Sequence, residues 1–232
     1  MNSSLAKQCV AEFIGTFALI FIGIGAIANN SSPAAGVGLL GVALAHGLAI
    51  AVMVSATGAI SGGQLNPAVT FGLLIGGHMD VKKTIAYWIA QLAGATAAAY
   101  LCAMLIGMSK VAGGTPDIGT NATGAAIVST GQAIAIEAVL TFFLVFVVYG
   151  SAVDVRAPKV GGLAIGLTVA LDILFGGPLT GAAMNPARTF GPALASSHWN
   201  NHMIYWVGPL IGGALAGLIY GRFLIKESTK TA

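Results

Sequence analysis

The residues of this chain that could do chemistry lie in two copies of one heptapeptide. Both copies read Asn-Pro-Ala, one further residue, then Thr-Phe-Gly, and they begin at Asn66 and Asn185. Each Pro suits the first turn of a helix, where its missing N–H costs nothing, and each Asn suits the cap of that turn. A helix that begins there directs free N–H groups and about half a positive charge toward its N-terminus. The two segments therefore predict two tips rich in hydrogen-bond donors.

The copies differ only at their fourth position, which is Val69 in the first copy and Arg188 in the second. A guanidinium is always charged and presents several donors in a rigid fork. It repels cations and offers hydrogen bonds to a neutral solute that has lost its hydration. Arg188 therefore predicts a positive constriction that only one copy supplies.

The elements that must position these residues lie in a membrane. Hydrophobic residues make up 56% of the 232 residues and mean hydropathy is +0.89. Charged residues make up only 7%, whereas soluble domains carry about 25%. Apolar runs of about 20 residues, the length that crosses a bilayer, predict six spanning helices. Their predicted spans are 8–29, 37–58, 82–107, 131–152, 160–178 and 202–226.

The two Asn-Pro-Ala segments, residues 66–76 and 185–195, are too short to cross. About ten helical residues rise only ~15 Å, half of a ~30 Å hydrocarbon core. Basic residues gather at the chain ends and in the loops after residues 76 and 152, which predicts that both termini are cytoplasmic. We expect a multi-pass protein of the cell membrane. Its net charge of +3 follows from this loop bias and needs no nucleic-acid partner.

Three landmarks repeat in the same order along the chain. Glu12 and Glu137 each begin Glu-x-x-x-Thr-Phe, the heptapeptide follows, and Tyr-Trp pairs begin at Tyr87 and Tyr205. Each half holds three spanning helices, and three is odd, so the second half enters the membrane from the opposite face. We predict one channel domain, 1–232, with a first half of about 1–112, a connecting loop of about 108–130 and a second half of about 131–232.

Inversion brings the two short helices into the middle of the membrane from opposite faces. Irregular backbone is tolerated there only where it lines a water-filled cavity or is buried in protein. The residues alone therefore predict an aqueous path with a positive centre, at the depth where inverted repeats commonly hold a solute.

The paired heptapeptides within duplicated three-helix halves resemble the aquaporin, or major intrinsic protein, family. The resemblance covers essentially the whole chain, including Glu12, Glu137 and both Tyr-Trp pairs. It implies an all-α, right-handed bundle of six transmembrane helices and two re-entrant half-helices. It also implies one pore in each monomer and a homotetramer in the lipid bilayer. No motif indicates an enzyme, a cofactor or a metal site.

The resemblance also implies roles for the two motifs. The Asn side chains would donate N–H groups to a passing water, which interrupts proton transfer along the file. Backbone carbonyls before each motif would form a ladder of acceptors. The motif residues are Asn66, Pro67, Ala68, Asn185, Pro186 and Ala187, and the ladder residues are Gly62, Gly63, Gln64, Leu65, Gly181, Ala182, Ala183 and Met184.

Residue-by-residue matching to the family gives a selectivity filter of four residues: His46, Ile173, Ala182 and Arg188. The set departs from strictly water-selective bacterial members, which have Phe and His at the first two places. It is similar to archaeal (aquaporin M) and plant vacuolar members. We expect a wider, less polar filter that passes water and small neutral solutes such as ammonia. Glycerol-type members have Asp directly after the filter arginine and Lys four residues later, where this chain has Thr189 and Ala193, so glycerol is the weaker expectation.

Three acids inside the apolar spans complete the candidate residues. The resemblance assigns Glu12 and Glu137 to supporting the two re-entrant loops through backbone N–H groups. Asp172 lies next to Ile173 and keeps a second function open, an ion-coupled inverted-repeat transporter. A third function with the same fold is a facilitator mainly for glycerol or dissolved gases. The function expected first is a passive channel that conducts water down osmotic gradients and excludes protons and ions.

Overall fold

The structure, a computed structural model, describes residues 4–32, 36–158 and 160–225, and these are almost entirely helical. The long helices are α1 (Leu5–Asn30), α2 (Gly38–Ser61), α4 (Val81–Ile106), α6 (Thr130–Val148), α7 (Gly161–Thr180) and α9 (Ile204–Ala216). The π-helical segments η1 (Tyr149–Val153) and η2 (Gly217–Leu224) extend α6 and α9. The short helices are α3 (Pro67–Ile75), α5 (Met108–Gly113) and α8 (Pro186–Ser196).

Six helices within the described residues are long and apolar enough to cross a membrane, as the sequence predicts. Their starts fit local capping rules. Ser4 and Asp80 accept hydrogen bonds from backbone N–H groups at the starts of α1 and α4, and Ser129 forms a capping box with Gln132 at the start of α6. The predicted end of the last span, residue 226, lies outside the described residues, as do Lys159, Lys226 and Lys230, which contributed to the predicted orientation.

The predicted connecting loop of about 108–130 contains an unpredicted helix, α5. Six residues are too few to show a helical period in the sequence, so the pattern could not reveal it. Val111 is fully buried in this helix, which contacts α1, α4 and α8. Tertiary packing therefore stabilises α5, and the loop proper begins after it.

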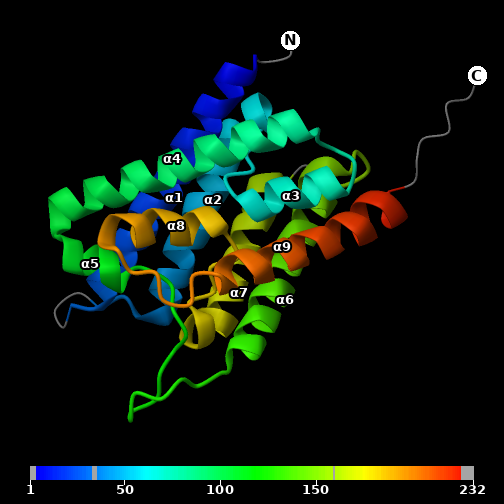
Figure 1. The fold of residues 1–232 in the computed structure, drawn as a ribbon. Helices are drawn as coiled ribbons and strands as arrows, with labels where there is room; N and C mark the ends of the chain where they lie inside the picture. Colours follow the sequence, from blue (N-terminus) through cyan, green and yellow to red (C-terminus); the bar gives the residue numbers. More distant parts are fainter. Residues whose placement is uncertain (1–3, 33–35, 159, 226–232) are drawn as a thin grey trace, which may run out of the picture.

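The two halves of the chain make matched contacts. α1 packs against α2 and α4, and α6 packs in the same way against α7 and α9. α3 lies against α9, and α8 lies against α4, so each short helix is held by a long helix of the other half (Figure 1). The contact between α2 and α7 joins the halves. The two short helices, far apart in the sequence, meet inside this bundle.

Small residues allow α2 and α7 to approach closely. A Cβ added at Gly47 would lie within 2.5 Å of the Gly166 carbonyl oxygen, and a Cβ at Gly166 would meet the Gly47 carbonyl oxygen as well. Small residues at helix contacts are the usual means of packing in lipid, where no hydrophobic effect drives helices together.

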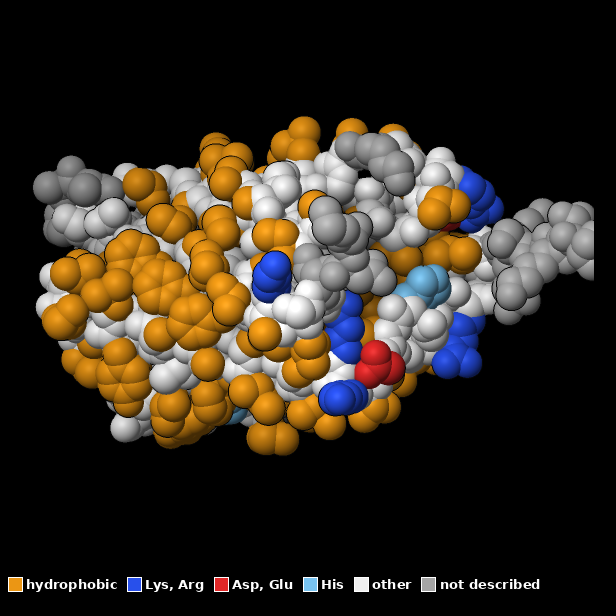
Figure 2. Space-filling model, turned by 90° about the horizontal axis from the view of Figure 1, so that it is seen from above, with side chains coloured by type: hydrophobic (Ala, Val, Ile, Leu, Met, Phe, Trp, Pro, Cys, Tyr) orange, Lys and Arg blue, Asp and Glu red, His pale blue; other side chains and the backbone are white. Residues whose placement is uncertain are grey.

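The outer surface of the bundle is hydrophobic. Large apolar side chains such as Val52, Phe143 and Leu171 are half or more exposed, as expected for residues that face acyl chains. Figure 2 shows hydrophobic side chains over much of one face, with charged side chains gathered toward one end of it. The polar residues that matter for the site lie inside the bundle, at the tips of α3 and α8.

Candidate functional site

The tips of α3 and α8 are joined by crossed hydrogen bonds. Asn66 Nδ2 donates to the carbonyl oxygen of Met184 (2.8 Å), and Asn185 Nδ2 donates to the carbonyl oxygen of Leu65 (3.0 Å). Each side-chain oxygen also accepts from the first turn of its own helix, at Ala68 N (2.8 Å) and Ala187 N (3.0 Å). The two asparagines thus cap their helices and tie the two halves of the chain together.

The backbone before each asparagine adopts the same unusual conformation in both halves. Gly63 and Leu65 have φ of 60° and 53°, and the corresponding Ala182 and Met184 have φ of 43° and 54°. Left-handed conformations are costly for residues with a Cβ, so three of these four positions are strained. This strain persists because surrounding groups hold the backbone in place.

Glu12 holds the first of these backbone segments. Its Oε1 accepts from Ser61 Oγ (2.6 Å) and Gln64 N (2.9 Å). Its Oε2 accepts from Leu65 N (2.6 Å) and Gln91 Nε2 (2.8 Å). Four donors surround a carboxyl that is fully buried, so each of its two oxygens accepts two hydrogen bonds.

Glu137 holds the second segment in the matching way. Its Oε1 accepts from Thr180 Oγ1 (2.7 Å) and Ala183 N (2.9 Å), and its Oε2 accepts from Met184 N (2.7 Å). Glu137 is also fully buried. The two acids therefore accept hydrogen bonds from equivalent backbone positions of the two halves.

Sequence reasoning missed three of the supporting side chains, Ser61, Thr180 and Gln91. Ser61 and Thr180 each lie five residues before the motif asparagine, so a repeated hydroxyl at one offset was the available signal. Tyr87 and Tyr205, noticed only as landmarks, donate from their hydroxyls to the carbonyls of Ser61 (2.7 Å) and Thr180 (2.8 Å). Nothing in the sequence pattern singles out Gln91, and among the described residues no equivalent side chain is bonded to Glu137.

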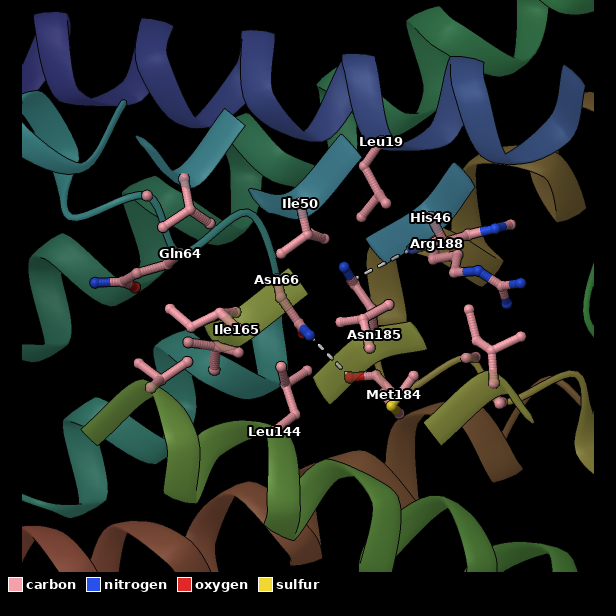
Figure 3. A pocket seen from close by; sticks show the side chains of 18 residues that line it. Leu19, His46, Ile50, Gln64, Asn66, Leu144, Ile165, Met184, Asn185 and Arg188 are labelled. Atoms are coloured by element: carbon pink, nitrogen blue, oxygen red, sulfur yellow. Dashed lines mark hydrogen bonds between the residues drawn. The ribbon is translucent and has the colours of Figure 1, made fainter. Parts of the chain in front are cut away.

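A narrow cavity passes both asparagine tips (Figure 3). All four predicted filter residues line it, as do five of the ladder residues: Gly63, Gln64, Ala182, Ala183 and Met184. Gly181 lines the adjoining outer cavity instead. Gly62 and Leu65 line neither cavity. Pro67, Ala68, Pro186 and Ala187 are buried and form the first turns of the two short helices rather than the wall.

His46 and Arg188 lie together on one side of the asparagines (Figure 3). His46 Nδ1 lies 2.8 Å from the Val42 carbonyl, and since a carbonyl only accepts, Nδ1 carries a proton. Its Nε2 lies over Gly23, where an added Cβ would come within 2.5 Å of this nitrogen. The missing side chain at Gly23 therefore makes room for the imidazole.

Arg188 is 8% exposed, and its Nε and Nη1 have no hydrogen-bond partner among the described residues. Buried donors are nearly always satisfied in native proteins. Together with the lining position of Arg188, the unpaired atoms indicate that this guanidinium hydrogen-bonds to whatever occupies the cavity.

A second, wider cavity adjoins the first and shares Ile173 and Arg188 with it. Asn30, Thr115 and Asp117 also line it, so its wall is more polar. Arg188 therefore lies at the junction between the central cavity and a polar outer mouth.

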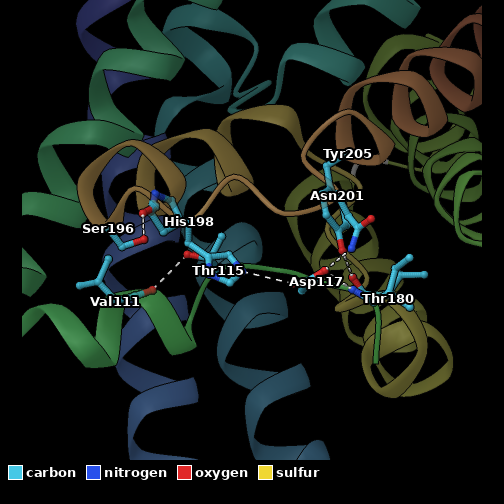
Figure 4. Close-up of polar contacts among 10 residues, drawn as sticks. Val111, Thr115, Asp117, Thr180, Ser196, His198, Asn201 and Tyr205 are labelled. Atoms are coloured by element: carbon cyan, nitrogen blue, oxygen red, sulfur yellow. Dashed lines mark hydrogen bonds and ion pairs between the residues drawn. The ribbon is translucent and has the colours of Figure 1, made fainter. Parts of the chain in front are cut away.

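Asp117 clamps the outer loop to the segment between α8 and α9 (Figure 4). It accepts from Asn201 Nδ2 (2.7 Å), from Ile118 N (2.7 Å) and from His198 Nε2 (3.2 Å). Partial burial alone would raise the pKa of Asp117, but these hydrogen bonds outweigh it and lower the pKa below its ordinary value. The clamp lies beside Gly181, since a Cβ there would meet Pro116 at 3.1 Å.

Asp172 does not line the central cavity. It lies in a lateral groove between α6 and α7 whose other residues are mostly apolar, including Phe143, Leu171 and Phe175. Its carboxyl is thus separate from the path past Asn66 and Asn185.

Comparison with known proteins gives one consistent family. The family model described as "Major intrinsic protein" matches residues 1–220. The chain is 49% identical to Aquaporin TIP4-1 of Arabidopsis thaliana over 95% of this chain and 87% of that protein. It is 44% identical to Aquaporin TIP2-1 of Zea mays over 98% of this chain and 91% of that protein. The X-ray structure of the aquaglyceroporin from Plasmodium falciparum is similar with a TM-score of 0.79 and 26% identity, covering 95% of this chain and 97% of that one.

Proposed function

The chain belongs to the major intrinsic protein family, and we propose that it is a passive membrane channel that conducts water down osmotic gradients and excludes protons and ions. The observation that carries the proposal is the cavity that passes both asparagine tips and reaches Arg188. Inverted halves that meet around such a path give a solute route through the middle of the membrane.

The asparagines supply the centre of the route. Each amide nitrogen has two hydrogens and donates one of them to the opposite tip. The second hydrogen of each amide serves water. A water that accepts from both Asn66 and Asn185 directs its own hydrogens away from the centre, so protons cannot pass along the file. The positive ends of α3 and α8 act in the same direction, because they repel a cation at this point.

The four filter residues lie on the extracellular side of the two asparagines. Arg188 supplies a fixed charge and free donors, and His46 supplies its Nε2. Ile173 and Ala182 face the same path with apolar side chains. The filter is therefore less polar than one made of four hydrogen-bonding residues. This composition suits water together with small neutral solutes such as ammonia, and to a lesser extent glycerol or dissolved gases. Ion-coupled transport is not favoured, since Asp172 lies in the lateral groove.

The channel is a multi-pass membrane protein made of two inverted halves, and both termini face the cytoplasm. Lys7, Lys82, Lys83, Arg156 and Arg222 lie on the cytoplasmic side of this arrangement and Lys110 on the other. Four copies form a ring. Each copy offers an apolar groove on α1 and α2 and a different apolar groove on α6 and α7, which suits the head-to-tail contacts of a cyclic assembly.

Stopped-flow light scattering of proteoliposomes tests the proposal. Vesicles that contain the protein should shrink in hyperosmotic buffer about tenfold faster than empty vesicles. This ratio corresponds to a barrier to water permeation that is ~1.4 kcal/mol lower. An imposed pH or sodium gradient should not change this rate. Shrinkage at the rate of empty vesicles contradicts a water channel, and a rate that follows the ion gradient supports coupled transport instead.

A further inference from the structure

The repeat has a second asymmetry besides Val69 and Arg188. The residue two positions before the motif asparagine is Gln64 in the first half and Ala183 in the second. Both residues line the central cavity. Each half therefore contributes one long polar side chain that the other half lacks. Because the halves are inverted, Gln64 and Arg188 lie on opposite sides of the asparagines, as Figure 3 shows.

The amide of Gln64 has a defined orientation. Its Nε2 lies 3.5 Å from Met79 Sδ, and a thioether has no hydrogen to donate, so the NH₂ group faces the sulfur. Its Oε1 is buried and has no partner within the described part of the chain. A buried acceptor without a partner is costly, so this oxygen is expected to hydrogen-bond to the contents of the cavity.

The surroundings of Gln64 are apolar. The apolar side chains of the cavity wall include Val54, Val148 and Ile165, and Val54 lies beside Gly63, where an added Cβ would meet its Cα at 3.1 Å. The polar side chains of the described wall are His46, Gln64, Asn66, Asn185 and Arg188. Of these, Gln64 is the one that lies beyond the asparagines on the side away from Arg188. Its oxygen is therefore the side-chain acceptor of that half, beside the backbone carbonyls.

We propose that the Gln64 amide is a second selectivity element of the channel, at the cytoplasmic end, which accepts hydrogen bonds from the permeating molecule and favours water over ammonia. Water is a good hydrogen-bond donor, whereas the N–H of ammonia is a poor one, so an acceptor in an apolar stretch stabilises water more. Arg188 acts oppositely, because it donates to any solute with a lone pair. The inference rests on the proposed function, since it concerns molecules that cross this cavity.

The test compares water and ammonia permeability in the same proteoliposomes, by light scattering and by a trapped pH dye. Gln64→Met keeps the length of the side chain but removes the strong acceptor. It should lower water permeability about threefold and leave ammonia permeability unchanged. At 1.36 kcal/mol per factor of ten, a threefold loss corresponds to a barrier to water about 0.65 kcal/mol higher. Gln64→Leu is a second apolar variant with the same expectation. Gln64→Glu keeps an acceptor oxygen and should not show the loss of water permeability relative to ammonia permeability that the two apolar variants show.

Gln132→Met is the matched control, because Gln132 is exposed in the capping box of α6, away from the cavity. It should leave both permeabilities unchanged. Equal losses of water and ammonia in the Gln64 variants, or no loss of water in a folded variant, overturn the inference while the proposed function stands. Wild-type vesicles that conduct water no faster than empty ones overturn the proposed function, and the inference falls with it.

Discussion

Glu137→Gln is the substitution that most sharply separates a supporting carboxylate from a bystander. The wild-type carboxylate accepts from two backbone N–H groups, Ala183 N and Met184 N, and from the hydroxyl of Thr180. Glutamine has one acceptor oxygen and one NH₂ group at the same distance from the backbone. In either orientation of the amide, one of the two backbone N–H groups loses its acceptor and meets a donor instead.

The expected loss of stability follows from the number of hydrogen bonds that Glu137→Gln changes. A buried donor left without a partner costs about 1–3 kcal/mol, and the remaining bonds lose charge assistance worth about 1 kcal/mol each. The sum is roughly 3–5 kcal/mol, and we take about 3 kcal/mol because a neutral amide is less costly to bury than a carboxylate. The segment that Glu137 holds would then open about 100-fold more often. Since the Met184 carbonyl accepts from Asn66, opening disturbs the centre of the pore as well.

Two measurements check the prediction, thermal unfolding in detergent and osmotic water permeability in vesicles. Glu137→Gln should lower both. Glu12→Gln should have an effect of similar size because Glu12 makes the equivalent bonds to Gln64 N and Leu65 N. Gln132→Met serves as the control for water permeability, and in thermal unfolding it should show only the smaller loss expected from its capping-box bond. If Glu137→Gln conducts water and unfolds like the wild type, the carboxylate does not support the strained backbone and the reasoning is wrong.

Three further predictions concern the filter, the outer clamp and the lateral acid. Arg188→Val introduces the residue of the equivalent position, Val69. It should raise the proton leak and the glycerol leak about tenfold, which corresponds to a barrier ~1.4 kcal/mol lower, and it should retain the water flux. An unchanged leak in a dye assay would contradict the role of the guanidinium. The pKa of Asp117 is lowered by folding, so the clamp should be intact above about pH 4 and weaken as pH falls below it. At neutral pH, Asp117→Asn should make the backbone amides of residues 114–129 exchange hydrogen faster than in the wild type. Equal exchange rates in the variant and the wild type at every pH would refute the clamp. Asp172→Asn should leave water flux within about twofold, because the amide has the same shape as the buried carboxyl it replaces and lies outside the path. A larger loss would place Asp172 in the conduction route.

The membrane spans could be predicted because hydropathy and span length fix them almost alone. Each helix must satisfy its own backbone in lipid, so a long apolar run leaves few alternatives. The same reasoning fails for α5, whose six residues are stabilised by the burial of Val111 rather than by any local pattern. It also gives no sign of the π-helical turns η1 and η2, where the rings of Tyr149 and Tyr220 stack on each other.

The site could be predicted in outline because the motif repeats. Pro after Asn indicates a helix start, and two such starts in inverted halves must approach each other. The crossed bonds from Asn66 to Met184 and from Asn185 to Leu65 could not be predicted, since they depend on left-handed backbone conformations that non-glycine residues rarely adopt. The bridging position of Gln91 likewise exists only once α4 is packed against α1 and α3.

The central claim is that two donor-rich helix tips meet around an open aqueous path. A high-resolution structure of the protein in a lipid environment tests it most directly, through the ordered water that such density reveals. The account predicts a continuous file of water that touches Nδ2 of both Asn66 and Asn185 and extends to Arg188. Tips that lie apart, or protein atoms that fill the space between Gln64 and Arg188 and interrupt the file, would contradict it.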